Sequence, residues 1–295
     1  MTFRVGLLGT GPWAEIAHAP ALSGHPDVEF TGVWGRRPEV AADLAARFGT
    51  RAYDDVDALI ADVDAVAIAL PPDVQAPLAA RAAAAGRHLL LDKPLAATVH
   101  EARAVVEAVE ASGVASVVFF TVRFDRTTGE WVDQQAAAGG WFTGRADWLG
   151  SVFAGGDSPF AASPWRREKG GLWDVGPHAL SVLLPVFGDV TDVAAVRGSG
   201  DTVHVALRHA GGAASTATLS LTAPEPAAGV TVELRGERGV VTAPEPGEGA
   251  VEALRNAIDA LITAARTGQP HPCDARFALR VTETLASVEE ALGKS

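Results

Sequence analysis

The first third of the chain alternates short apolar runs with segments of helical periodicity. The run Ala-Val-Ala-Ile-Ala-Leu at residues 65–70 is typical of a parallel strand covered on both faces. Gly49, Gly86 and Gly113 each follow a helical segment, where a left-handed C-terminal cap favours glycine. This alternation predicts a doubly wound parallel α/β sheet. The predicted strands are 3–8, 28–34, 65–70, 88–91 and 116–121, and the predicted helices are 13–22, 39–48, 55–61, 73–85 and 98–111.

After residue 121 the pattern changes to longer β-type runs. Glycine-bearing turns at 210–212 and 235–239 separate several of them, which favours consecutive antiparallel strands. The segment 243–249 is rich in Pro and Gly and predicts a loop. We therefore expect a second domain of α+β class, with the boundary between residues 120 and 121. Its predicted strands are 145–153, 190–197, 202–208, 213–221 and 230–234, and its predicted helices are 251–267 and 275–293.

Composition narrows the class of protein. The 295 residues include 24 Lys and Arg against 36 Asp and Glu, so the formal net charge is 24 − 36 = −12. Nucleic-acid binding needs a basic footprint, which this charge argues against. Apolar runs are too short to span a membrane and the N-terminus lacks a signal peptide, so we expect a soluble, cytoplasmic protein. Cys273 is the single cysteine; it permits no intramolecular disulfide, and no ligand cluster predicts a metal site.

A glycine-rich turn follows the first predicted strand. Gly9-Thr10-Gly11-Pro12-Trp13-Ala14 has the form G-x-G-x-x-A and leads directly into a helix. The first glycine permits the tight turn, the second lets a pyrophosphate approach the backbone, and the small alanine lets helix and strand pack closely. The helix N-terminus adds a positive dipole end. The sequence therefore predicts a dinucleotide site here, which we expect also to include Leu70 and Pro71 after the 65–70 strand.

The end of the second predicted strand indicates which dinucleotide is preferred. A carboxylate at this position would bind the ribose hydroxyls of NAD, but the chain has Gly35-Arg36-Arg37-Pro38. A guanidinium group can bind a 2′-phosphate through two hydrogen bonds. We therefore favour NADP over NAD, with Arg36 and Arg37 as cofactor ligands. The alternative is that both arginines are solvated charges at a helix entry.

Two further motifs carry candidate chemistry. Lys93, in Leu91-Asp92-Lys93-Pro94, follows a predicted strand, and strand carboxyl ends face the ligand crevice of a wound sheet. Lys93 is thus a candidate acid, base or electrostatic clamp. Asp174 and His178 are four residues apart at a predicted helix start, which would place both side chains on one face. A carboxylate beside an imidazole can fix its tautomer and raise its basicity.

Together these motifs resemble the Gfo/Idh/MocA family of oxidoreductases over nearly the whole chain. Asp92-Lys93-Pro94 is similar to the family's E-K-P element and Asp174-x-x-x-His178 to its D-x-x-x-H element; Thr121-Val122-Arg123-Phe124 and Pro164-Trp165-Arg166 add support. The resemblance implies an N-terminal Rossmann domain, a C-terminal domain with a largely antiparallel open sheet often used for oligomer contacts, and hydride transfer between a nicotinamide and a sugar, polyol or similar carbinol.

The resemblance also implies roles for individual residues. Lys93 would hydrogen-bond the reacting hydroxyl or the ribose, His178 would take or give the hydroxyl proton, and Asp174 would orient that pair. Asp92 replaces the usual glutamate and would contact the cofactor side of the site. Trp173 and Ser181 also depart from the family pattern. The residues expected near the substrate are Arg123, Trp165, Arg166 and Trp173.

Two alternatives keep the same fold with a different function. One is a nucleotide-sensing regulatory protein without turnover, against which the retention of Lys93, Asp174 and His178 argues. The other is a redox-neutral hydrolase or epimerase that uses a bound nicotinamide transiently. In either case the expected partner is a small molecule and the expected assembly a homo-dimer or homo-tetramer.

Overall fold

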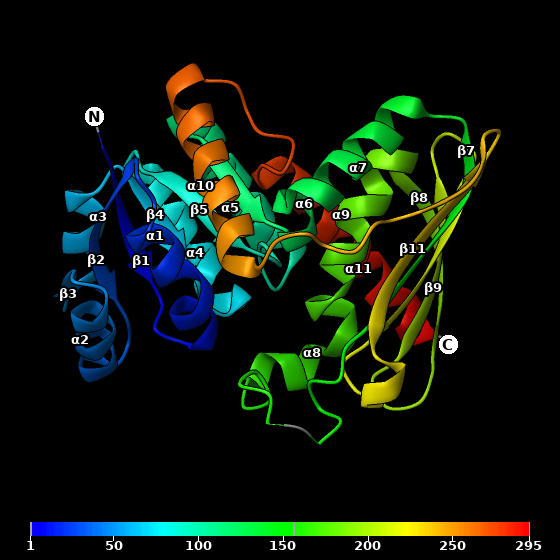
Figure 1. The fold of residues 1–295 in the computed structure, drawn as a ribbon, viewed down its shortest axis with the longest axis horizontal. Coiled ribbons are helices and arrows are strands. Elements are labelled where there is room, and N and C mark those ends of the chain that lie inside the picture. Colours follow the sequence, from blue (N-terminus) through cyan, green and yellow to red (C-terminus); the bar gives the residue numbers. More distant parts are fainter. Residues whose placement is uncertain (1, 156, 295) are drawn as a thin grey trace. The chain divides into compact units, whose positions relative to one another are not determined.

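The computed structural model describes residues 2–155 and 157–294. They form two compact units (Figure 1). The first unit consists of Met1–Asp125 and Glu248–Leu279, and the second of Arg126–Gly247 and Arg280–Ser295. The first unit is therefore discontinuous in sequence, and a single division after residue 120 leaves out its returning segment.

The first unit contains a six-stranded parallel sheet. Its strand order is β3-β2-β1-β4-β5-β6, so the order reverses between β1 and β4, as it does in a doubly wound sheet. All four residues of β4 are buried, which explains why that strand is wholly apolar. The strands are β1 (Phe3–Leu8), β2 (Val28–Trp34), β3 (Arg51–Tyr53), β4 (Ala65–Ile68), β5 (His88–Asp92) and β6 (Ser116–Phe119).

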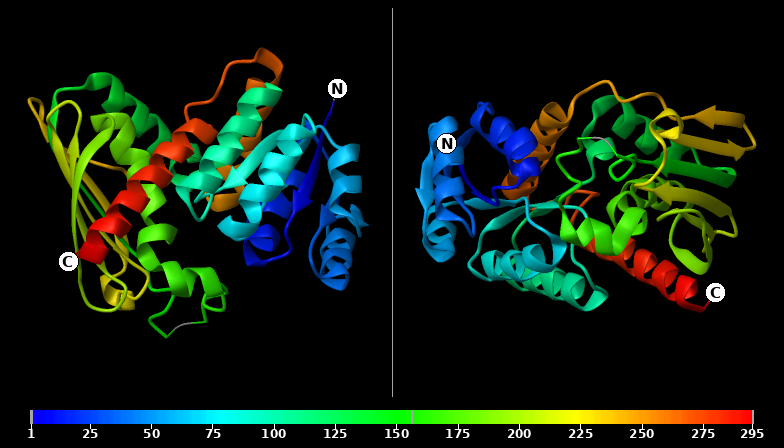
Figure 2. Two further views of the ribbon diagram at one scale, coloured as in Figure 1. Left: turned by 180° about the vertical axis from the view of Figure 1, so that it is seen from behind. Right: turned by 90° about the horizontal axis from the view of Figure 1, so that it is seen from below.

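Helices cover both faces of this sheet, as Figure 2 shows. On one face α10 packs against α1, β5 and β6, and on the other α4 packs against α5. Positive φ angles of 64°, 76° and 65° confirm the caps predicted at Gly49, Gly86 and Gly113. The helices are η1 (Ala14–His18, a π-helix), α1 (Ala19–Ser23), α2 (Pro38–Arg47), α3 (Val56–Asp62), α4 (Pro72–Ala84), α5 (Val99–Ser112), α6 (Thr121–Phe124) and α10 (Ala250–Thr267).

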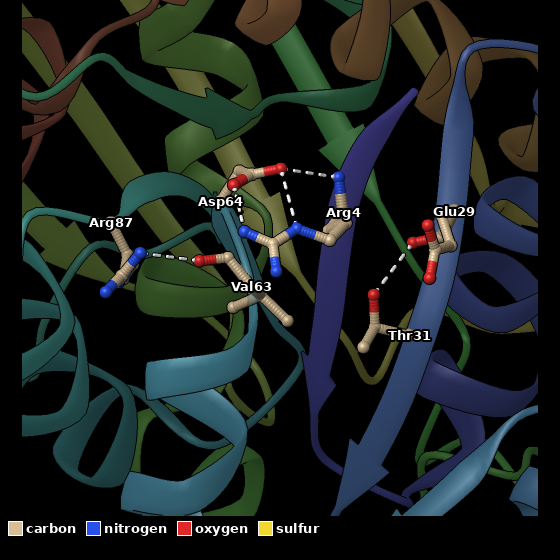
Figure 3. A network of polar contacts seen from close by, with 6 residues as sticks. All are labelled: Arg4, Glu29, Thr31, Val63, Asp64 and Arg87. Carbon is tan, nitrogen blue, oxygen red and sulfur yellow. Dashed lines mark hydrogen bonds and ion pairs between the residues drawn. The ribbon is translucent and has the colours of Figure 1, made fainter. Parts of the chain in front are cut away.

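A charged network lies where β1, β4 and β5 begin (Figure 3). The guanidinium group of Arg4 donates to the carboxylate of Asp64 at 2.7 Å and 3.2 Å, and these bonds lower the pKa of Asp64. Arg87 donates to the carbonyl oxygen of Val63 at 2.8 Å. The network connects the amino ends of these parallel strands. The glycine-rich turn follows the carboxyl end of β1, so the network and the turn lie at opposite ends of the strands.

The second unit contains a mixed six-stranded sheet. Its order is β12-β11-β7-β10-β9-β8, and β7 pairs with β10 in parallel. The expected largely antiparallel sheet is confirmed, and this one pair is parallel because two helices between β7 and β8 return the chain to the same end of the sheet. The other pairs are antiparallel. The strands are β7 (Trp141–Leu149), β8 (Val190–Arg197), β9 (Val203–His209), β10 (Ala214–Ser220), β11 (Gly229–Gly236) and β12 (Gly239–Thr242).

Helices lie on one face of the second sheet. Both α8 and α9 pack on β10, and α9 also packs on β7 and α7. Within the described part of the chain, no helix covers the opposite face, where His204, Ala206 and Arg208 of β9 are exposed (Figure 1). The alternating burial of β9 reflects this half-covered sheet. The helices are α7 (Arg126–Ala138), α8 (Pro164–Asp174), α9 (Gly176–Phe187), η2 (Glu225–Ala227) and α11 (Ala275–Lys294), whose first residues belong to the first unit.

Candidate functional site

The glycine-rich turn lies between the end of β1 and the first helical residues. Gly9 has a φ of 131°, and a Cβ atom there would lie 2.3 Å from the carbonyl oxygen of Ala69, so only glycine fits. A Cβ atom on Gly11 would meet no atom within 4 Å. The backbone is thus open at Gly11, where the motif expects a pyrophosphate. The turn fits a dinucleotide on this observation.

The segments that follow β2 and β4 lie beside this turn. A Cβ atom on Gly35 would lie 2.6 Å from Cγ2 of Thr10, so the chain passes close to the turn as it leaves β2. Arg36 and Arg37 come next, both exposed, and α2 begins at Pro38. Leu70 and Pro71, which follow Ala69 directly, are half-buried. The chain segments that carry these predicted cofactor residues therefore begin beside the turn, at Gly35 and at Ala69.

Lys93 follows β5 directly and is half-buried. The side chain of Gln75, on α4, bonds the backbone on both sides of it: its amide nitrogen donates to the carbonyl oxygens of Asp92 at 2.8 Å and Pro94 at 3.1 Å. The carboxylate of Asp92 accepts from the indole nitrogen of Trp13 at 3.2 Å. The element similar to E-K-P and the glycine-rich turn are therefore in direct contact.

Asp174 and His178 lie on two helices rather than one. Asp174 ends α8, Val175 intervenes, and His178 is the third residue of α9. The expectation that both lie at one helix start is wrong, because Asp174 ends one helix and the other begins at Gly176, although Val175 between them keeps right-handed helical angles of φ −101° and ψ −20°. An Oδ atom of Asp174 lies 3.2 Å from Nε of Arg166, whose side chain is 19% exposed. The predicted substrate residue Arg166 thus forms an ion pair with the predicted catalytic carboxylate.

The imidazole of His178 stacks on the indole of Trp148 on β7. The ring centroids are 5.4 Å apart and the planes differ by 14°. This contact restricts the orientation of the imidazole ring. Sequence reasoning missed Trp148, although it shares a strand face with the buried Ala146, two residues earlier, and that period-two spacing could have placed it on the inner face.

The other predicted substrate residues have different surroundings. Trp165 is half-buried, and the Arg166 guanidinium group lies 4.6 Å from its ring centroid. Trp173 is only 2% exposed and donates to the carboxylate of Glu289 at 3.2 Å, so it packs α8 against α11. Arg123, on α6, is half-buried and belongs to the first unit.

A half-buried carboxylate fixes the double glycine that precedes Leu172, Trp173 and Asp174. Gly170 adopts φ 61° and ψ −161°, and a Cβ atom on Gly171 would lie 2.7 Å from Cα of Ser220. Asp201 accepts from the backbone nitrogens of Gly171 at 2.8 Å and Leu221 at 2.9 Å. Sequence reasoning gave Asp201 no role, because its partners lie 20 and 30 residues away.

Among residues 2–155 and 157–294, no group of three His, Cys, Asp or Glu side chains could hold a metal ion. No helix in these ranges is long and apolar enough to cross a membrane.

A parallel sheet with an open glycine-rich turn defines a nucleotide-binding class of protein, and comparison with known proteins places the chain within it. Residues 3–120 match the oxidoreductase family with an NAD-binding Rossmann fold, and residues 99–242 match the GFO/IDH/MocA C-terminal domain. The chain belongs to the Gfo/Idh/MocA family of oxidoreductases. This confirms the resemblance and the two fold types predicted from sequence.

Individual relatives are similar over part or all of the chain. Inositol 2-dehydrogenase of Rhizobium meliloti is 36% identical over 42% of this chain and 38% of its own length. A dTDP-3,4-didehydro-2,6-dideoxy-α-D-glucose 3-reductase of Streptomyces antibioticus is 31% identical over 63% of this chain and 57% of its own. The chain thus spans between 38% and 57% of the length of these curated relatives. The solved structure of GenD2 from gentamicin A biosynthesis, in complex with NAD, has a TM-score of 0.84 and 25% identity, covering 99% of this chain and 94% of GenD2.

Proposed function

We propose that the protein is an NAD(P)-dependent dehydrogenase or reductase that acts on a CH–OH group. It transfers a hydride between the nicotinamide and a sugar, polyol or similar small carbinol or carbonyl substrate. The observation that carries the proposal is the contact between Trp13 of the open glycine-rich turn and Asp92, which precedes Lys93. That contact connects a nucleotide-binding element to a candidate proton-handling element.

The proposed chemistry divides between the cofactor and three side chains. The bound nicotinamide supplies the hydride acceptor or donor. In the oxidising direction His178 takes the proton of the substrate hydroxyl, and in the reducing direction it returns that proton to the carbonyl oxygen. The ammonium group of Lys93 stabilises the negative charge that develops on this oxygen. Asp174, paired with Arg166, and Trp148, stacked on the imidazole, hold the surroundings of His178 in place.

NADP is the cofactor that we favour. The support is the pair of exposed guanidinium groups of Arg36 and Arg37, which follow β2 where an NAD-preferring site would carry a carboxylate. The turn residues Gly9–Trp13, with Leu70, Pro71, Asp92 and Lys93, complete the proposed cofactor site. The buried Cys273, which is in no disulfide, is compatible with the reducing cytoplasm that we propose as the location of the protein.

The substrate that we propose carries hydroxyl groups and an apolar ring face. Trp165 is the candidate aromatic contact, because the ring of Trp173 is buried and packs α8 against α11; Arg123 and Arg166 could bind hydroxyl, carboxylate or phosphate oxygens. The names of the relatives support this class, since one acts on inositol and another on a dTDP-sugar. In this proposal residues 1–120 bind the dinucleotide and residues 121–295 bind substrate and form a homo-dimer or homo-tetramer.

Turnover with variants of the two proton-handling residues tests this function. We expect the wild-type protein to bind NADPH or NADH, as followed by nicotinamide fluorescence, and to reduce or oxidise the cofactor with a member of a panel of polyols, sugars and nucleotide-sugars. Lys93→Ala and His178→Ala should each lower kcat by about 100-fold or more, because acid–base assistance is lost, and His178→Ala, outside the proposed cofactor site, should keep a cofactor Kd close to wild type.

Other outcomes would contradict the proposal. Unchanged turnover in both variants would remove the assigned roles. Cofactor binding without turnover on any substrate would favour a regulatory protein. A tightly bound cofactor that undergoes no net redox change during substrate conversion would favour the redox-neutral alternative.

A further inference from the structure

The carboxylate of Asp92 joins two helical positions to the segment of Lys93. Asp92 is only 9% exposed and ends β5. One carboxylate oxygen accepts from the indole nitrogen of Trp13 at 3.2 Å, and the other lies 3.3 Å from Nε2 of His18. His18 is fully buried. The two side chains next to the Asp92 carboxylate, Trp13 and His18, therefore both come from the helix that begins at the glycine-rich turn.

The helical segment between Trp13 and His18 is a π-helix. The backbone nitrogen of Ala19 donates to the carbonyl oxygen of Ala14, which closes a turn one residue longer than an α-helical turn. The extra residue moves each later side chain by one position relative to an uninterrupted α-helix, and it brings His18 to Asp92. Single π-turns inside helices are rare and occur frequently at functional sites.

The partners of Asp92 are themselves held in place. Gln75 is fully buried and both donates to the carbonyl oxygen of Asp92 at 2.8 Å and accepts from its backbone nitrogen at 2.9 Å. The same amide group donates to the carbonyl oxygen of Leu95 at 3.2 Å. The Trp13 ring stacks on Phe119 with centroids 6.4 Å apart. The carboxylate thus lies between a fixed backbone on the Lys93 side and a fixed indole on the turn side.

We infer that Asp92 is a positioning residue that couples the conformation of the cofactor turn to the placement of Lys93 through Trp13 and His18. Ordering of the turn by a nucleotide stabilises the Lys93 segment, and ordering of that segment stabilises the turn by the same free energy, since such coupling is reciprocal. The shorter side chain of aspartate suits this role because the long indole of Trp13 reaches it. The inference rests on the proposed function only in naming a nicotinamide nucleotide as the ligand of the turn.

A double-mutant cycle tests the coupling. NADPH and NADH are titrated into the wild-type protein, Trp13→Phe, Asp92→Ala and the double variant. Trp13→Phe keeps an aromatic ring and removes the donor. Each single variant should raise the cofactor Kd by about three- to tenfold. The double variant should raise the Kd no further than the weaker-binding single variant does, because the two substitutions remove the same contact. Fold-changes that multiply in the double variant, or single variants that bind as wild type, would overturn the coupling.

Control variants separate this effect from general damage. Trp141→Phe removes an indole donor whose acceptor is the carbonyl oxygen of Gln135, in the second unit, and should leave the Kd unchanged. Asp92→Asn retains an oxygen that can accept from Trp13 and should bind more tightly than Asp92→Ala. If Asp92→Ala does not fold, the cofactor Kd of Asp92→Asn can still be measured and compared with the wild type.

Amide hydrogen exchange tests the same coupling by a second measurement, first in the nucleotide-free protein and then with bound NADH. In the nucleotide-free protein, Asp92→Ala should speed exchange in peptides covering residues 10–18, and Trp13→Phe should speed exchange in peptides covering 92–97, with α5 unaffected. Saturating NADH should protect residues 92–97 in the wild type and not in Asp92→Ala. A wild type that binds neither nucleotide would refute the proposed function, whereas exchange that changes only around each substituted residue would refute the coupling itself.

Discussion

Arg36 is the residue on which cofactor choice is expected to depend. A guanidinium group that binds a 2′-phosphate contributes roughly 1.5–3 kcal/mol through charge-assisted hydrogen bonds, and NADH has no such phosphate. Arg36→Ala should therefore weaken NADPH binding by about tenfold or more and change NADH binding little. The measurement is the Kd of each nucleotide, with Arg103→Ala, an exposed arginine of α5, as the matched control. Equal losses for both nucleotides would mean that Arg36 does not contact the phosphate.

At the scale of single residues, candidate site residues could be predicted from the sequence where a local motif restricts the residue type. The glycines of the turn and Lys93 could be predicted because strand ends and turn geometry restrict residue type locally. Asp201 and His18 could not, because Asp201 acts through partners distant in sequence and His18 through an irregular turn, whereas the period-two spacing from Ala146 could have placed Trp148 on the inner face. The π-turn changes the helical register between Trp13 and His18, so periodicity alone gave no role to His18.

At the scale of secondary-structure elements, His209 connects three of them. It ends β9, and its ring nitrogens lie 2.9 Å from the carbonyl oxygen of Gly188, which caps α9, and 2.8 Å from the hydroxyl of Ser215 on β10. Burial lowers the pKa of His209, partly opposed by the bond to Gly188. The native state therefore favours a neutral ring in which one nitrogen donates and the other accepts.

This pKa shift makes folding stability depend on pH in a definite direction. The unfolded chain binds a proton at His209 near pH 6.5 and the folded chain only at lower pH. The stabilisation is thus present above about pH 6.5 and is lost as the pH falls from there toward the folded pKa, at no more than about 1.4 kcal/mol per pH unit. Urea unfolding of the wild type between about pH 8 and about pH 5 should show this loss. His209→Gln, which does not titrate, should show a smaller pH slope, whereas His204→Gln, at an exposed position of β9, should match the wild type.

Most elements could be predicted from periodicity, whereas their pairing could not always be. Strands β1, β2 and β8 have the predicted bounds. Apart from the helix start expected at Asp174 and His178, the sequence pattern predicts neither α7 nor the extents of α8 and α9. It therefore does not predict the parallel pairing of β7 and β10, which a long helical connection allows.

At the scale of the whole molecule, the uncovered face of the second sheet is the surface that we expect a second copy to cover. Small and hydroxyl-bearing side chains line a shallow depression there, among them Ala194, Ala206, Thr216 and Thr218. Such side chains let two sheets approach closely. The wild type should then sediment at a multiple of 30.4 kDa.

A charge placed in this face should dissociate the assembly. Ala206→Glu would bury an unpaired carboxylate in the interface and should shift the protein to monomer in analytical ultracentrifugation. Ala227→Glu makes the same substitution at an exposed position of η2 and should leave the mass unchanged. A wild type that is already monomeric, or an Ala206→Glu variant that keeps its mass, would contradict this arrangement.

The return of the chain to its first unit could not be predicted from the sequence. The helix at 250–267 is clearly amphipathic, with Leu254, Ile258 and Leu261 buried along one face. Periodicity shows that this face must be covered, but it does not show by which sheet. In the structure it packs on β5, β6 and η1 of the first unit.

That discontinuity has a consequence for synthesis on the ribosome. The strands of the first unit emerge within the first 119 residues, yet the helix that completes one of their faces ends at Thr267. At roughly 5–20 residues per second, the nascent chain waits on the order of ten seconds or more with apolar surface of β5 and β6 uncovered. During that interval the cofactor turn exists without its finished support, so the nucleotide-binding unit matures only after the chain has been made as far as Thr267.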